Sequence, residues 1–319
     1  TAGEQILINN SLAAAKSVTV TTTGGPGADD DFNAIVLDTA AGITSAGWTS
    51  DGSGGEVRLQ GVGNVVLGGM VLAGGTVVQT FNGAGRLTGE TINWSSEISS
   101  VNISASGQLN LGIETLGGSG AMVEKGARVL ASQAVMLSGG ANSERIGVRL
   151  PGAATIAVAN PNGEITINAA QDAWLMGQIV AGGTVIDSYD ADGFYLGSTV
   201  KTFGGDSVLR ITADEQIRLG RDLIAGKLID VRGGVSQHPV TAEDPWADEG
   251  IVIGGNVQIR TWQQNSTINL SAAGDMSVLT PAWTQEIVAD GFAEYADGRL
   301  SEAVSLQLTV EQGSVDAVH

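Results

Sequence analysis

The residues whose types and spacing best suit chemistry are three aspartates, Asp187, Asp190 and Asp192, which stand just before Gly193. Carboxylate oxygens spaced along a turn are ligands that a hard cation such as calcium prefers. The matching segment 108 residues earlier, residues 79–85, contains no carboxylate. The pattern therefore favours a solvent-exposed turn, with a calcium site as the alternative, and no other cofactor is expected.

The longest irregular segment, residues 232–250, supplies a second candidate, because it contains His238 and Trp246 among several acids. A tryptophan in a loop on a rigid scaffold suits stacking on a sugar ring or packing against a neighbouring chain. Covering one side of the fold is an equal alternative for it. These two residues are therefore the expected interaction residues.

Catalysis is not expected from this composition. The chain has two histidines and no cysteine, which argues against a Ser-His-Asp triad, a multi-histidine metal site and a cysteine nucleophile. The enzymatic alternative is a polysaccharide hydrolase or lyase, whose chemistry needs clustered carboxylates in an open groove. No such cluster repeats on one face of the predicted strands.

The chain is acidic and rich in aliphatic residues. Its 34 Asp and Glu residues against 15 Lys and Arg give a formal net charge of −19, which argues against a nucleic-acid partner because phosphate binding needs clustered cations. Hydrophobic residues form 42% of the chain, which indicates a folded protein and not a disordered one. No long apolar run is present, so we expect neither a membrane span nor a secretory signal within these residues.

A tandem repeat organises the chain. Residues 55–112 recur in register at residues 163–220, and the run from Ala73 to Thr76 returns as Ala181 to Thr184. A third copy is more divergent. The repeat predicts one continuous section of a larger chain, divided into three units of about 106 residues each: 1–103, 104–211 and 212–319.

Short runs of Val, Ile and Leu separated by Gly, Asn, Asp and Ser predict an all-β fold. The runs follow too closely for crossover helices, so a parallel β-solenoid and a string of small β-sandwiches are the two possibilities. Aromatic residues form only 4% of the chain, which favours the solenoid over sandwiches built around a buried Trp or Tyr.

Three-sided coils of about 20–25 residues would place about five coils in each repeat unit. Each coil would bury its aliphatic side chains against the coils above and below it. Eight side chains are expected to point into this one continuous core: Val57, Leu59, Val77, Ile103, Ile165, Ile167, Val185 and Ile211.

The Gly-rich aliphatic lines at residues 105–112 and 270–278 resemble the repeats of filamentous haemagglutinin-like bacterial exoproteins. The turn at residues 160–163, Asn-Pro-Asn-Gly, also looks like a turn of the secretion domain in that family. The resemblance implies a right-handed parallel β-helix and a structural role at the cell surface, as an adhesin shaft or as part of a filament or sheath.

The expected partners are further coils or copies of the same protein stacked end to end. Both ends of the sequence continue the alternating strand pattern, and a coil without a cap exposes unpaired backbone groups. Cell-surface glycans are the alternative partner, because a β-helical module that binds or cleaves polysaccharide would share this scaffold.

Overall fold

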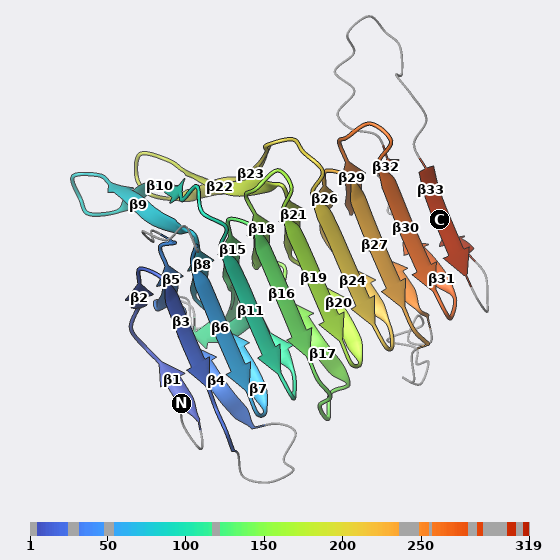
Figure 1. Cartoon of the computed structure of the whole chain (residues 1–319), viewed down its shortest axis with the longest axis horizontal. Helices are drawn as coiled ribbons and strands as arrows, with labels where there is room; N and C mark the ends of the chain where they lie inside the picture. The colour runs from blue at the N-terminus through green and yellow to red at the C-terminus, as the bar shows by residue number, and fades with distance from the viewer. Residues whose placement is uncertain are drawn as a thin grey trace, which may run out of the picture.

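The computed structural model describes residues 5–24, 32–47, 54–116, 122–235, 249–254, 257–279, 286–289, 305–310 and 315–318. Every helix or strand within these residues is a β-strand. Three long parallel sheets run along the molecule, and three two-stranded antiparallel hairpins accompany them (Figure 1). The expected all-β class is confirmed.

The three sheets are called I, II and III in the order in which the chain first reaches them. Sheet I contains β1 (Ile6–Ile8), β4 (Asn33–Leu37), β7 (Asn64–Leu67), β12 (Leu109–Asn110), β17 (Ile146–Leu150), β20 (Asp172–Leu175), β25 (Ile217–Leu219), β28 (Ile251–Ile253), β31 (Met276–Leu279) and β34 (Val315–Val318). Sheet II contains β2 (Leu12–Ala14), β5 (Gly42–Ser45), β8 (Met70–Ala73), β15 (Arg128–Ala131), β18 (Thr155–Val158), β21 (Gln178–Ala181), β26 (Leu223–Ala225), β29 (Gln258–Thr261) and β32 (Glu286–Ala289).

Sheet III contains β3 (Ser17–Thr21), β6 (Glu56–Gly61), β11 (Ser100–Ala105), β16 (Ala134–Gly139), β19 (Glu164–Ala169), β24 (Val208–Ala213), β27 (Leu228–Gly233), β30 (Thr267–Ala272) and β33 (Ser305–Val310). The hairpins are β9 (Gly75–Phe81) with β10 (Leu87–Trp94), β13 (Gly112–Leu116) with β14 (Met122–Gly126), and β22 (Gly183–Tyr189) with β23 (Tyr195–Thr202).

The chain passes from sheet I to sheet II to sheet III and then returns to sheet I, so each circuit adds one strand to every sheet. A circuit without an insertion has the expected length, since β17 begins at Ile146 and β20 at Asp172. Hairpins and long connections lengthen other circuits. One repeat of 108 residues carries β6 onto β19 with only β11 and β16 between them, so the expectation of about five coils in each unit was wrong and the number is three.

The main core is a set of aliphatic ladders inside the three sheets. In sheet III, Leu59, Ile103, Leu137, Ile167 and Ile211 are register partners on successive strands, and all are fully buried. Neighbouring strands lie about 4.8 Å apart, so each side chain packs on equivalents above and below it. Six of the eight expected core positions belong to this core: Val57, Leu59, Ile103, Ile165, Ile167 and Ile211.

The other two expected core residues, Val77 and Val185, are elsewhere. They lie on the hairpin strands β9 and β22 and pack in a second, smaller apolar cluster outside the three-sheet core. The aliphatic pattern of the hairpins resembles that of the coil strands, because both kinds of strand bury one face. The pattern alone does not say which surface covers that face.

Two glycines mark the points where the chain leaves sheet II to form these hairpins. Gly74 and Gly182 both have φ of +78°, a left-handed conformation that residues with a Cβ adopt at a cost. A Cβ at Gly74 would lie 2.5 Å from Ser99 Oγ, and one at Gly182 would lie 2.4 Å from Ser207 Oγ. The repeated Gly-Gly pair therefore encodes a tight exit from the sheet.

Candidate functional site

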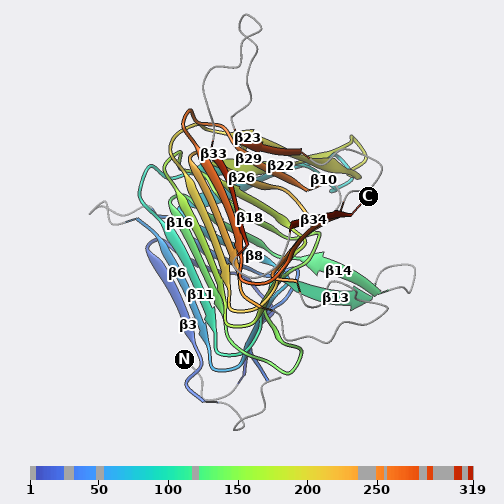
Figure 2. The same cartoon turned by 90° about the vertical axis from the view of Figure 1, so that its right-hand side faces the viewer.

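Two hairpins, β9–β10 and β22–β23, cover part of the outer face of sheet II, and together they are called the hairpin platform. Figure 2 shows β10, β22 and β23 gathered on one side of the sheets. The outer face beneath them is an apolar ladder of Leu72, Leu130, Ala157, Val180 and Ile224. Side chains of the hairpins pack on this ladder, so burial of apolar area holds the platform to the sheet: Val77, Ile92, Trp94, Val185 and Val200.

The two hairpins also contact each other at their tips, although they are three circuits apart. Asn82 Nδ2 donates a hydrogen bond to the carbonyl oxygen of Ala191 over 2.8 Å, and Arg86 donates to the carbonyl oxygen of Asp192 over 3.1 Å. The Arg86 guanidinium also lies 5.7 Å from the centre of the Phe194 ring. Equivalent segments of the two repeats therefore join into one surface.

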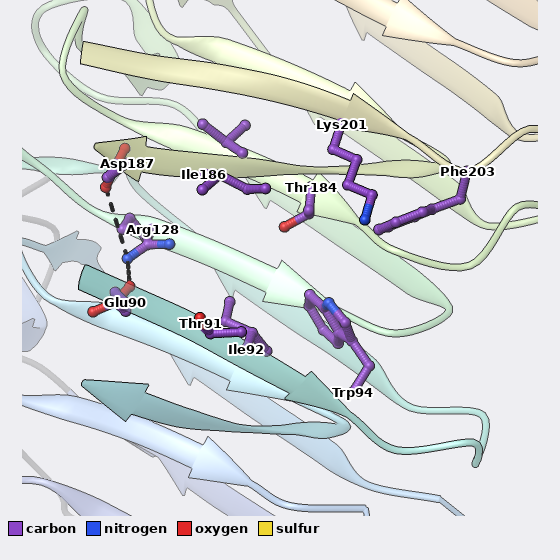
Figure 3. A pocket seen from close by; sticks show the side chains of 11 residues that line it. Glu90, Thr91, Ile92, Trp94, Arg128, Thr184, Ile186, Asp187, Lys201 and Phe203 are labelled. Atoms are coloured by element: carbon purple, nitrogen blue, oxygen red, sulfur yellow. Dashed lines mark hydrogen bonds and ion pairs between the residues drawn. The ribbon is translucent and has the colours of Figure 1, made fainter. Parts of the chain in front are cut away.

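Between the hairpins lies a pocket of about 300 Å³, called the inter-hairpin pocket. Its walls come from β10 and β22, and Arg128 of β15 reaches up between them (Figure 3). Its lining residues are Glu90, Thr91, Ile92, Trp94, Arg128, Thr184, Val185, Ile186, Asp187, Lys201 and Phe203. This volume is at the small end of the range for ligand sites, and a mixed lining with a few polar groups is typical of them.

One end of the pocket is closed by an ionic cluster. Arg128 forms an ion pair with Glu90 and lies 3.9 Å from a carboxylate oxygen of Asp187, so it connects the two hairpins. Burial by itself would raise the pKa of Glu90, but the Arg128 guanidinium and hydrogen bonds from Gln79 and Arg128 outweigh it, and the pKa lies below its ordinary value. A general acid in glycoside cleavage needs a raised pKa, so Glu90 is poorly suited to that role.

The opposite end of the pocket carries aromatic side chains. Figure 3 shows Trp94 and Phe203 at this end, with Lys201 beside Phe203. The Lys201 ammonium lies 5.6 Å from the centre of the Phe203 ring, which is a cation–π distance. Among the described residues no carboxylate lies within ion-pair distance of Lys201, so this ammonium group can receive an anion.

The predicted calcium ligands have different roles. Asp187 accepts a hydrogen bond from the Ser198 hydroxyl over 2.6 Å and faces Arg128. Asp190 caps the hairpin tip by accepting from the backbone N–H groups of Asp192 and Phe194. In the part of the chain that the structure describes, no group of three His, Cys, Asp or Glu side chains is placed to hold a metal ion. The structure thus shows a hydrogen-bonded turn at this position.

The other predicted interaction residues, His238 and Trp246, lie outside the described residues. The sequence prediction missed Glu90, Arg128 and Lys201. A signal for the acids was present, because the cross-strand pair Gln79–Glu90 in the first hairpin corresponds to Asp187–Ser198 in the second. Each pair contains one acid, and nothing local marks Arg128 as their common partner.

Comparisons of the chain with protein-family models, with curated proteins and with solved structures found no match. A search of the described residues for a helix long and apolar enough to cross a membrane found none.

Proposed function

We propose that the chain is a right-handed parallel β-helical section of a large extracellular bacterial surface protein, an adhesin shaft or a filament or sheath component. Three parallel sheets built by successive circuits support the solenoid part of this proposal. Its function is to hold attachment surfaces on a rigid scaffold. It performs no catalysis, and its contacts are with other protein.

The observation that carries the attachment role is the distribution of exposed apolar side chains. Among the described residues, half of the large exposed apolar side chains belong to the hairpin platform or its immediate end. Leu196 retains 67% of its accessible surface and Phe194 retains 62%. Apolar side chains gathered on one surface mark sites of interaction. The platform members are Val78, Phe81, Ile186, Phe194, Leu196 and Phe203.

End-to-end stacking of further coils or copies is the second contact that we propose. The strand order leaves β1, β2 and β3 with one hydrogen-bonded neighbour each among the described strands. Open strand edges pair readily with another strand. The lateral platform and the axial edges are independent surfaces, so one protein can use both.

Negative-stain imaging and sedimentation of the purified chain at increasing concentration test the proposal. Nine described circuits predict a unit about 43 Å long, and we expect it to associate into longer or laterally paired rods. Replacing Phe194 and Leu196 with serine should abolish lateral pairing and leave axial stacking intact. Single units at every concentration, with no binding to cell-surface protein, would contradict the attachment role.

A glycan-binding module is the second candidate, favoured by the aromatic end of the inter-hairpin pocket. Trp94 and Phe203 offer ring faces, and Thr91 and Thr184 offer hydroxyl groups to the same pocket. Calorimetry with soluble oligosaccharides, comparing the wild type with Trp94→Ala, tests this candidate. Binding that Trp94→Ala abolishes would place glycans ahead of protein as the ligand.

A further inference from the structure

The walls of the inter-hairpin pocket are strand edges. Consecutive residues line each wall, residues 90–92 on β10 and residues 184–187 on β22. Successive side chains of a strand point to opposite faces, so consecutive lining residues mean that the pocket runs along the edge and not across one face. β10 lies beside β22 along this pocket.

Both edges are unpaired. β10 forms a ladder only with β9, and β22 forms a ladder only with β23, in two separate two-stranded sheets. Every second N–H and C=O group of a strand points to each side, so half of these groups on β10 and on β22 face the pocket. Such edges accept another strand.

From these edges we propose that the inter-hairpin pocket binds an extended peptide segment of a protein partner by strand addition. The bound segment hydrogen-bonds through its backbone to β10, β22 or both, and so connects the two hairpins into one sheet. The inference deepens the proposed attachment function, on which it rests, by naming an extended peptide as the partner's chemistry.

The dimensions set the length of the segment. Four consecutive wall residues on β22, from Thr184 to Asp187, span about 14 Å at the usual rise of an extended strand. The segment in contact is therefore about four residues long. Backbone hydrogen bonds supply affinity in this mode, and side-chain contacts supply the sequence preference.

The charges of the pocket set the preference. Arg128 is already paired with Glu90 and faces Asp187, whereas Lys201 at the aromatic end has no carboxylate partner among the described residues. An acidic side chain of the peptide therefore fits beside Lys201. Apolar or threonine side chains fit the remaining wall, which contains Ile92 and Ile186.

The probes are six labelled hexapeptides of alternating Thr and Val, each with Glu at a different position. We expect at least one of them to bind the full chain with a Kd of about 100 µM or tighter in fluorescence anisotropy. The control peptides carry the same side chains but have N-methyl groups on alternate amides. Because they cannot donate along one edge, they should bind at least about ten-fold more weakly.

Two matched variants locate the site. Ile186→Arg places a long cation in the pocket and should weaken binding at least about ten-fold. Val78→Arg changes an exposed aliphatic residue of β9 that does not line the pocket, and binding should stay within about two-fold of the wild type. Lys201→Gln should remove the preference for Glu over Gln in the peptide. Circular dichroism establishes that each variant is folded.

Hydrogen exchange gives a readout specific to strand addition, since bound peptide should protect amides of β10 and β22 more than those of β9. No binding by any peptide, equal binding of the N-methylated controls, or displacement by oligosaccharide would each overturn the inference. If peptides fail while the rods still associate, the attachment function stands without this site. If peptides bind while the chain stays as single units, the site stands and self-assembly falls.

Discussion

Replacement of Arg128 by methionine tests how the hairpin platform is held. Methionine keeps much of the apolar stem of arginine and removes the guanidinium that pairs with Glu90 and faces Asp187. The Glu90 side chain is only 9% exposed, so its carboxylate would be left in the pocket without a cation. The free energy of unfolding should therefore fall by more than the value of a surface ion pair.

The magnitude follows from the remaining partners. Breaking a fully buried ion pair costs about 3–5 kcal/mol because one charge stays uncompensated. Here Glu90 keeps a hydrogen bond from Gln79, and Asp187 keeps one from Ser198, while Arg128 is 22% exposed. We expect Arg128→Met to cost about 2–3 kcal/mol. Adding Glu90→Gln should recover about 1 kcal/mol of this loss, because the buried charge is then gone.

The dependence on pH gives a second readout. In the wild type the pKa of Glu90 lies below its ordinary value of 4.5, so its ionised form contributes stability that is present above pH 4.5 and is lost as the pH falls through the lowered pKa. Without Arg128, burial raises that pKa, and acidification removes a penalty. The difference in stability between wild type and Arg128→Met should therefore shrink from pH 7 to about pH 3.

Chemical denaturation followed by tryptophan fluorescence, with hydrogen exchange of the hairpin strands, measures both effects. The matched control is Arg210→Met, because Arg210 pairs with Glu164 on the outer face of sheet III and both side chains are more than 40% exposed. That change should cost less than about 1 kcal/mol. Equal costs for the two variants, with the same dependence on pH, would refute the reasoning about the ionic cluster.

Three further predictions concern the scaffold. Ile167→Ala removes a fully buried side chain between two ladder partners and should cost about 3–4 kcal/mol in denaturation, whereas Val77→Ala, which is half-buried under the platform, should cost about 1–2. Gly182→Ala should cost about 2–3 kcal/mol through its left-handed φ and its contact with Ser207, and a normal melting temperature would argue against that backbone conformation. Calcium chelation should leave the β-type circular dichroism signal unchanged, since Asp190 is used in a hydrogen-bonded turn, and loss of signal restored by calcium would count against this.

Much of the architecture could be predicted from the sequence. Residues such as Leu59 and Ile167 lie in runs that alternate with polar residues, and period two is enough to predict which face of a strand is buried. The tight spacing of these runs excluded crossover helices, and the repeat at 108 residues predicted equivalent elements, as β6 and β19 show. These are local properties of the chain, and local sequence carries them.

The site depended on contacts between distant residues. Val77 and Val185 alternate like coil residues, yet their partners lie on the outer face of sheet II, and no local pattern distinguishes an inner from an outer apolar surface. Glu90, Arg128 and Asp187 are separated by 38 and 59 positions in the chain. They meet because the fold carries the second hairpin back beside the first over β15. Only that three-dimensional stacking decides which charges are paired, which strand edges stay open, and where the pocket forms.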